Sequence, residues 1–201
     1  MEKTLFLLDI DYILDKNNYP IIRIFCKDEN GNDYLVLYKK FLPYFYVYSN
    51  ENLKEKIENL KFEDTKIEKV EEVKKKFLRK ELNVLKVTIS NPRKVPDVRK
   101  YIKDNFNVIE TFEYDIPFYR RFIIDNDIKP FSWIKVIGEE IKDKIILAEK
   151  IEQLEIEKYP KLKVYGFDIE IAEEKNEEKI IFISIVGNDG FEKILGIYDI
   201  N

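Results

Sequence analysis

The sequence predicts an α+β fold in which a β meander is followed by a βαββαβ unit and then by the first strands of a further domain. Three observations predict it: short apolar runs near the N-terminus separated by turn residues, mixed strand and helix periodicity from residue 44 to 112, and closely spaced apolar runs after residue 163. The 201 residues, 45% apolar and 14% aromatic, are sufficient to bury a core.

The meander comprises three expected strands, Leu5 to Leu14, Ile21 to Cys26 and Tyr34 to Tyr38. The turn signal Asn17-Asn18 separates the first two, and Asn30-Gly31-Asn32 separates the second from the third. Short connections of this kind join antiparallel neighbours, so we expect consecutive strands to pair.

The pattern changes after Pro43, where strand-like and helix-like segments alternate. The expected order is strand Tyr44 to Tyr48, helix Asn52 to Leu60, strands Ile67 to Val73 and Val84 to Ile89, helix Val95 to Phe106 and strand Val108 to Phe112. This is the βαββαβ order of the ferredoxin-like (RRM-like) unit, which many nucleic-acid-binding modules use.

A further helix is expected from Pro117 to Asp125, with Asp115 as its cap and a proline in its first turn. Residues 131–162 are strand-like in places and then strongly charged, so we interpret them as a connecting region with a boundary near Pro160. The predicted domains are therefore 1–130 and 163–201, on either side of this region.

The last part of the chain contains three apolar runs, Val164 to Ile171, Ile180 to Val186 and Ile194 to Tyr198, with a turn at Asn188-Asp189-Gly190. This predicts the opening meander of a second domain. A three-stranded sheet without helical cover leaves an apolar face and an edge exposed. We therefore expect the sequence to be truncated or to depend on a partner segment.

Composition excludes several kinds of site. The chain has no histidine, so a Ser-His-Asp triad, a Cys-His pair and a histidine-ligated zinc site are all excluded. Cys26, the only cysteine, lies in an apolar run and is expected to be a buried, unreactive thiol. Neither a signal peptide nor a membrane-length apolar run is evident, so a soluble cytoplasmic protein is expected. The net charge of -4 requires any nucleic-acid contact to come from a local basic patch.

Asp168 and Glu170 end an apolar run two residues apart. On a strand, both side chains would project from the same face. Paired carboxylates supply the oxygen ligands that Mg²⁺ or Mn²⁺ prefers, and two such ions can support phosphodiester hydrolysis. The alternative is a strand end whose polar residues simply meet solvent.

Four blocks of sequence resemble a known family, the archaeal family B replicative DNA polymerases. They are Leu8-Asp9-Ile10-Asp11-Tyr12, Phe41-Leu42-Pro43-Tyr44-Phe45-Tyr46, Asn91 to Arg99, and Phe112-Glu113-Tyr114-Asp115-Ile116-Pro117-Phe118 with its continuation to Asp125. Phe167-Asp168-Ile169-Glu170 falls where the first exonuclease motif of that family belongs.

The resemblance implies that residues 1–130 form the polymerase N-terminal domain and that 163–201 begin an RNase H-like 3'-5' proofreading exonuclease. By that analogy, Asp168 and Glu170 are catalytic residues that hold Mg²⁺ or Mn²⁺. Ile171 stands where the family usually has threonine. The remaining exonuclease carboxylates and the palm motifs are absent from these 201 residues, so we expect this segment alone to be inactive.

The resemblance also implies a pocket that recognises uracil in the template strand. The matching positions are Tyr12, Pro43, Tyr44, Val95, Ile116, Pro117 and Phe118. Arg99 and Arg121 match basic residues that support this pocket and the DNA. Without the resemblance, these residues would be core aromatics, turns and solvated helix arginines. The run from Lys74 to Lys80 could meet template phosphates, or be a solvated loop.

The resulting hypothesis is the N-terminal part of a DNA-directed DNA polymerase, a nucleotidyltransferase of DNA replication that binds single-stranded template and takes dNTPs through its palm domain. A sliding clamp is a candidate partner, and no membrane partner is expected. The alternative is a stand-alone, non-catalytic module that binds single-stranded DNA and uracil. A complete small nuclease using Asp168 and Glu170 is a third alternative, which lacks a sufficient set of further carboxylates.

Overall fold

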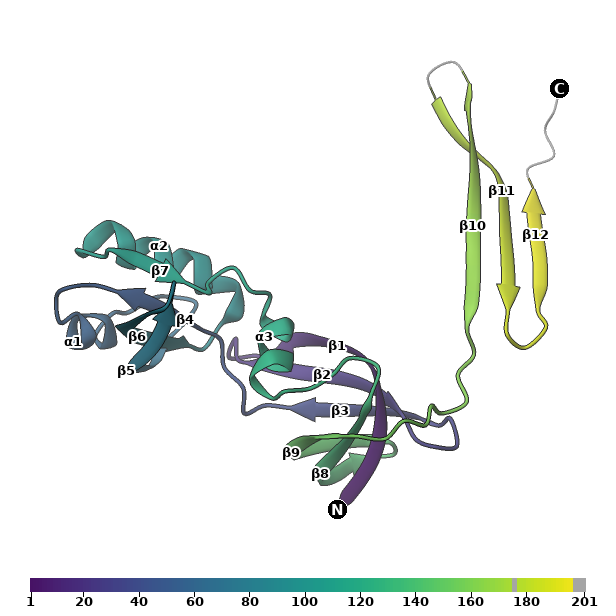
Figure 1. The fold of residues 1–201 in the computed structure, drawn as a ribbon, viewed down its shortest axis with the longest axis horizontal. Coiled ribbons are helices and arrows are strands. Elements are labelled where there is room, and N and C mark those ends of the chain that lie inside the picture. Colours follow the sequence, from purple (N-terminus) through teal and green to yellow (C-terminus); the bar gives the residue numbers. More distant parts are fainter. Residues whose placement is uncertain (175–176, 197–201) are drawn as a thin grey trace. The chain divides into compact units, whose positions relative to one another are not determined.

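The computed structural model describes residues 1–174 and 177–196 and divides into two compact units, Met1–Lys158 and Tyr159–Asn201 (Figure 1). The first unit contains a closed five-stranded barrel and a four-stranded sheet, and the second contains a three-stranded sheet. The sheet-rich α+β class predicted from the sequence is confirmed.

The barrel is built from strands that come from both ends of the first unit. They are β1 (Glu2–Leu14), β2 (Pro20–Lys27), β3 (Asp33–Tyr38), β8 (Trp133–Lys142) and β9 (Ile145–Leu154), in the order β1-β2-β3-β9-β8. The antiparallel pairing of β1 with β2 and of β2 with β3 confirms the meander. The parallel pair β3–β9 and the antiparallel pair β1–β8 close the barrel, which removes exposed sheet edges.

The expected connecting region 131–162 differs from the structure. Residues 133–154 are the paired strands β8 and β9, and the unit boundary falls between Lys158 and Tyr159. The charged residues of β9 alternate with buried ones: Ile146, Ala148 and Ile151 face the core. High charge therefore reflects a strand with one solvated face and not a linker.

The four-stranded sheet has the expected ferredoxin-like arrangement. Its elements are β4 (Tyr44–Tyr48), α1 (Lys54–Glu58), β5 (Ile67–Phe77), β6 (Lys80–Ile89), α2 (Val95–Asn105) and β7 (Glu110–Phe112). The strand order is β5-β6-β4-β7, with antiparallel neighbours throughout. Side chains of α1 and α2, including Ile57, Val98 and Ile102, pack on one face with Phe45 and Val47 of β4.

The basic run from Lys74 to Lys80 forms a hairpin rather than the solvated loop considered from the sequence. Strand β5 extends through Phe77, and β6 begins at Lys80. Leu78 and Arg79 make the turn with φ of 46° and 69°. Two consecutive positive φ values are typical of the tight turns that match strand twist.

Helix α2 is preceded by a short 3₁₀ turn, Pro92–Lys94, whose first available backbone N–H, that of Arg93, is capped by the Asn91 side chain. The Asn91 side-chain oxygen accepts from the Arg93 N–H at 3.0 Å, and its amide donates to the Asp64 carbonyl at 3.1 Å. These bonds fix the position at which α2 begins.

Helix α3 (Phe118–Asp125) covers the barrel with Phe118 and Phe122, which pack against Phe41 at ring-centroid distances of 5.3 and 5.4 Å. The expectation that Asp115 caps this helix was wrong. Pro117 occupies the cap position, and no side chain bonds the first turn. Proline suits this position because the missing N–H costs nothing there.

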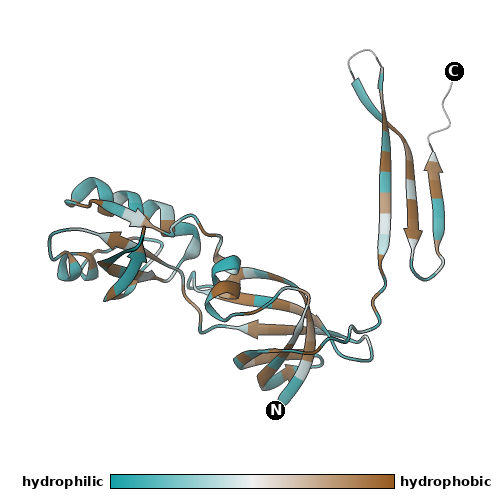
Figure 2. Ribbon diagram, viewed as in Figure 1, coloured by the Kyte–Doolittle hydropathy of each residue, from teal (hydrophilic) through white to brown (hydrophobic). Residues whose placement is uncertain are grey.

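The second unit is the expected meander of β10 (Tyr165–Glu174), β11 (Glu177–Gly187) and β12 (Glu192–Gly196). Gly190 takes φ 85° in the turn before β12. Apolar side chains remain exposed on this sheet, for example Phe167 at 70% and Ile194 at 74%, and apolar segments recur along it in Figure 2. Residues 197–198, which the sequence assigned to the last strand, lie outside the described residues.

Candidate functional site

A cavity of about 280 Å³ lies in the first unit and is lined by every residue predicted for the uracil pocket. Its lining residues are Tyr12, Pro43, Tyr44, Pro92, Val95, Pro96, Glu113, Tyr114, Asp115, Ile116, Pro117, Phe118 and Arg121. Its volume falls near the small end of ligand pockets, which begin at roughly 300 Å³.

Four separate elements position these side chains. Tyr12 comes from β1, Tyr44 from β4, Val95 from the first residue of α2 and Phe118 from the first residue of α3. The 113–117 segment between β7 and α3 completes the lining. The cavity therefore lies where the barrel, the four-stranded sheet and α3 meet.

The apolar wall is closely packed. The Tyr12 and Phe118 rings make an edge-to-face contact at 5.1 Å. Phe118 and Val95 are each only 7% exposed. Packed aromatic walls of this kind do not yield readily, so they can discriminate between ligands by shape.

Arg121 brings a buried positive charge to the cavity. Its Nη2 lies 2.5 Å from Glu113 Oε2, and its Nη1 lies 3.6 Å from Asp125 Oδ1. Burial acts to lower the pKa of Arg121, but Tyr44, Glu113 and Asp125 outweigh it and raise the pKa. Arg121 Nε has no hydrogen-bond partner in the described part of the chain. A permanently charged residue therefore lines the cavity, while its Nε is buried away from solvent.

Tyr44 is held in the wall by two contacts. Its hydroxyl donates to Asp125 Oδ2 at 2.6 Å, and the Arg121 guanidinium lies 4.9 Å from its ring centroid. Burial, followed by the hydrogen bond to Asp125, raises the pKa of Tyr44 well above its usual range. The hydroxyl is therefore neutral and has a fixed direction.

Arg99 does not line the cavity but contacts a residue that does. Its guanidinium lies 3.8 Å from the Tyr114 ring centroid, and its Nε donates to Thr111 Oγ1 at 2.7 Å. Arg99 thus supports the wall from behind through Tyr114.

Several lining residues were missed from the sequence, namely Pro92, Pro96, Glu113, Tyr114 and Asp115. All lie inside the two blocks quoted above, Asn91 to Arg99 and Phe112 to Asp125, so the contiguity of those blocks was the available signal. Glu113 adopts φ 59°, a left-handed conformation that is uncommon outside glycine.

The segment after Glu113 also supplies a free backbone donor. Among the described residues, the N–H of Ile116 makes no hydrogen bond to another protein group. Ile116 is one of the residues that line the cavity.

Asp168 and Glu170 lie on β10, opposite Ser184 and Phe182 of β11. They are two residues apart before a register shift that follows Glu170, so both project from the same face of the sheet. Both are exposed, and Asp168 Oδ1 accepts from the Ile169 N–H at 3.0 Å. In the part of the chain that the structure describes, no group of three or more potential metal ligands is found.

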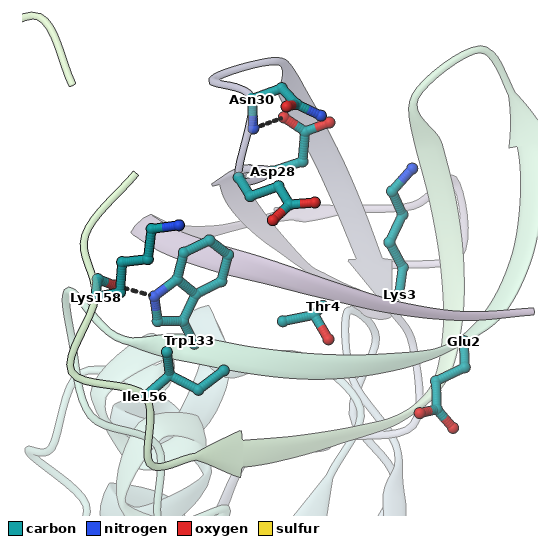
Figure 3. Close-up of a pocket in the computed structure, with 9 residues that line it drawn as sticks. Glu2, Lys3, Thr4, Asp28, Asn30, Trp133, Ile156 and Lys158 are labelled. Carbon is teal, nitrogen blue, oxygen red and sulfur yellow. Dashed lines mark hydrogen bonds between the residues drawn. The ribbon is translucent and has the colours of Figure 1, made fainter. Parts of the chain in front are cut away.

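A larger cavity of about 630 Å³ lies at the barrel, away from the predicted residues (Figure 3). It is lined by Glu2, Lys3, Thr4, Asp28, Glu29, Asn30, Trp133, Ile156 and Lys158. Two of its polar side chains bond the backbone of other lining residues. Asp28 Oδ1 accepts the Asn30 N–H at 3.0 Å, and the Trp133 indole donates to the Lys158 carbonyl.

No helix among residues 1–174 and 177–196 is long and apolar enough to cross a membrane.

Comparison with known proteins identifies relatives along nearly the whole chain. The family described as "DNA polymerase family B, exonuclease domain" matches residues 109–197. "DNA polymerase 3" of Saccharolobus shibatae is 30% identical over 94% of this chain and 26% of its own length. A "DNA polymerase" of Pyrococcus glycovorans is 32% identical over 94% of this chain and 22% of its own.

The fold is also shared. The family B DNA polymerase structure from the hyperthermophilic archaeon Pyrobaculum calidifontis superposes with a TM-score of 0.79, covering 96% of this chain and 26% of that one at 24% identity. The chain thus spans about a quarter of the length of its Saccharolobus relative. These matches agree with the resemblance seen in the sequence blocks. The chain is therefore a homologue of the archaeal family B DNA polymerases and corresponds to their N-terminal segment.

Proposed function

We propose that this chain is the part of a DNA-directed DNA polymerase that inspects the single-stranded template and captures uracil. The observation that carries the proposal is the convergence of Tyr12, Tyr44, Val95 and Phe118 on one cavity of about 280 Å³. Primed DNA and dNTPs would be substrates of the complete polymerase. A sliding clamp as partner and a cytoplasmic location remain part of the same proposal.

Discrimination between uracil and thymine must be steric. The two bases present the same hydrogen-bonding edge and differ by one methyl group. A wall formed by the edge-to-face pair Tyr12 and Phe118, with Pro43 beside it, would overlap that methyl. One methylene in a shaped pocket is typically worth ~1–3 kcal/mol, and a wall that does not yield can exceed this.

To bind the polar edge of uracil, the pocket needs hydrogen-bond donors, and these donors must also reject cytosine. The Ile116 N–H, which makes no hydrogen bond among the described residues, is a donor suited to a carbonyl oxygen of uracil. Cytosine presents an amino group where uracil presents an acceptor, so it would leave a donor facing a donor.

The second part of the proposal concerns proofreading. Asp168 and Glu170 offer carboxylate oxygens on one strand face, which fits Mg²⁺ or Mn²⁺ as donor chemistry. When bound, such ions polarise a phosphodiester and supply a nucleophilic water. The role of the two carboxylates is to hold and orient the ions. Two ligands do not complete a two-metal site, so other carboxylates must contribute.

The alternative function is a stand-alone module that binds uracil-containing single strands without catalysis. The same pocket would serve it. Primer extension by a longer protein carrying this chain separates the two: stalling ahead of a template uracil supports the polymerase.

Fluorescence anisotropy tests the proposed base recognition directly. The 201-residue chain is titrated against matched single-stranded oligonucleotides that differ only in one central uracil, thymine or cytosine, at one stated salt concentration. We expect the uracil strand to bind most tightly, by roughly 5-fold or more over thymine. Equal affinity for the uracil and thymine strands would refute recognition by this pocket.

A further inference from the structure

The face of the four-stranded sheet opposite α1 and α2 is aromatic. Tyr44, Tyr46 and Tyr48 alternate along β4 on this face, and Phe112 of β7 packs with them. The hairpin end of β5 adds Phe77, whose ring centroid lies 4.8 Å from that of Phe112. The two helices pack on the other face, with Phe45 and Val47.

A cavity of about 250 Å³ opens on this face. It is lined by Tyr46, Lys75, Lys76, Phe77, Leu82, Val84, Phe112 and Glu113. Tyr46, 3% exposed, forms its floor, whereas Phe77 is 46% exposed at its rim. The Phe77 ring is therefore accessible to a planar ligand without rearrangement of the core.

The cavity adjoins the uracil pocket. Glu113 lines both cavities. Tyr44 lines the uracil pocket and Tyr46 lines this cavity, and the two residues are two positions apart on β4 with ring centroids 5.5 Å apart. A ligand longer than one base could therefore occupy both at once.

The surroundings are strongly basic. Lys75 Nζ lies 4.9 Å from the Tyr46 ring centroid, and Lys86 Nζ lies 3.8 Å from that of Tyr44. The hairpin adds Lys74, Lys76, Arg79 and Lys80 with no acidic residue between them. Glu113, the carboxylate among the lining residues, is already paired with Arg121. Exposed aromatic rings can stack on the bases of a single strand, and the surrounding cations can bind its negatively charged phosphates.

We propose that this surface, the hairpin platform (Tyr46, Lys75, Phe77 and Phe112), binds the nucleotide next to the captured base in the same single strand. A neighbouring base stacks on Phe77, and Lys75 and the hairpin cations contact the phosphates. That the ligand is the same template strand whose uracil is captured rests on the proposed function, whereas the stacking of a base on Phe77 does not. Because every base has an aromatic face, this contact is independent of sequence.

The test uses Phe77→Ala in the 201-residue chain and anisotropy at one salt concentration. The substitution should weaken binding of both uracil and thymine strands by roughly 5- to 150-fold, the loss expected for one base–aromatic stack, and leave the ratio of their affinities unchanged. Leu78→Ala is the matched control, since Leu78 is 81% exposed at the same turn but does not line the cavity. It should bind as the unmodified chain does.

A second readout reports stacking itself. A strand with 2-aminopurine beside the uracil should lose fluorescence on binding the unmodified chain and much less on binding Phe77→Ala. Lys75→Gln should reduce the salt dependence of binding. Equal affinities of Phe77→Ala and the unmodified chain, with equal quenching, would overturn the platform.

Three further outcomes are informative. If the unmodified chain does not discriminate uracil from thymine but still depends on Phe77, the platform stands and the uracil pocket fails. Tighter binding of a matched RNA strand than of DNA would overturn the assignment to template DNA. The chain could also self-associate, with both Phe77→Ala and Leu78→Ala abolishing the association and leaving DNA affinity unchanged. That result would overturn the platform and assign the hairpin tip to protein–protein contacts.

Discussion

The Tyr44 hydroxyl donates a hydrogen bond of 2.6 Å to the Asp125 carboxylate, which joins β4 of the four-stranded sheet to the last residue of α3. The same carboxylate lies 3.6 Å from Arg121. One carboxylate thus holds both the aromatic and the charged wall of the candidate pocket.

Tyr44→Phe should therefore destabilise the fold by about 1 kcal/mol, the usual contribution of one partly buried hydrogen bond. Equilibrium urea unfolding measures this difference. Tyr48→Phe is the control, since among the described residues the Tyr48 hydroxyl makes no hydrogen bond. An equal loss of stability in both variants would contradict a specific role for the Asp125 bond.

Val95→Gln should abolish the preference for uracil. Val95 lines the cavity and is 7% exposed, so a longer polar side chain there would fill space that the base needs. The affinity for the uracil strand should fall to that for thymine in the anisotropy assay. Asn105→Gln, on an exposed position of the same helix, should leave the preference intact. A preserved preference in Val95→Gln would place the base elsewhere.

In a longer protein that carries a complete exonuclease, Asp168→Ala or Glu170→Ala should reduce 3'-5' degradation by about 10²- to 10³-fold and spare primer extension. Each removes one metal ligand, whereas synthesis uses a separate site. Degradation of labelled single strands and primer extension are measured side by side. Full exonuclease activity in both variants would remove them from the catalytic set. The 201-residue chain alone should show no Mg²⁺-dependent degradation.

Gly138→Ala should destabilise the barrel by about 1–3 kcal/mol. A Cβ at Gly138 would overlap the Leu147 carbonyl oxygen and approach the Ala148 Cα to 2.8 Å. Gly166→Ala, on β10 of the second unit, adds a Cβ that meets nothing within 4 Å and should leave the melting of the first unit unchanged. Thermal unfolding of the first unit distinguishes them. Similar melting of the two variants would mean that β9 shifts to accommodate the methyl.

Cys26 should be unreactive in the folded chain. Burial raises the pKa of its thiol from 9.0 to about 12, so the reactive thiolate is scarce at pH 8. Iodoacetamide labelling at pH 8 should be at least about 100-fold slower in the native chain than in guanidinium chloride. Rapid labelling of the native chain would show that the barrel opens readily at β2.

Local pattern sufficed for the elements whose partners are near in sequence. The meander and the ferredoxin-like unit were predicted correctly because hairpins and the alternation of buried residues encode them within short windows. Strands β8 and β9 were misread as a connecting region, since β8 pairs with β1 and β9 pairs with β3, each more than a hundred residues earlier, and no local signal specifies those pairings.

The candidate pocket was predictable only in part for the same reason. Its aromatic positions follow from the resembling blocks, but the bonds that hold them do not. The ion pair of Arg121 with Glu113 depends on a left-handed residue at the end of β7, and the Asp125 contact depends on how α3 meets the sheet. Such tertiary contacts are absent from residue type and spacing.

The parallel pairing of β3 with β9 also determines when the barrel can close during synthesis of the chain. The first three strands leave the ribosome well before the segment that closes their barrel, and at about 5–20 residues per second the delay is several seconds or more. The intervening ferredoxin-like unit has its own core and all its own strand partners, so it can fold during that wait. The N-terminal strands must then remain soluble with an unpaired edge, which makes this interval the point at which the nascent protein is most exposed to misassembly.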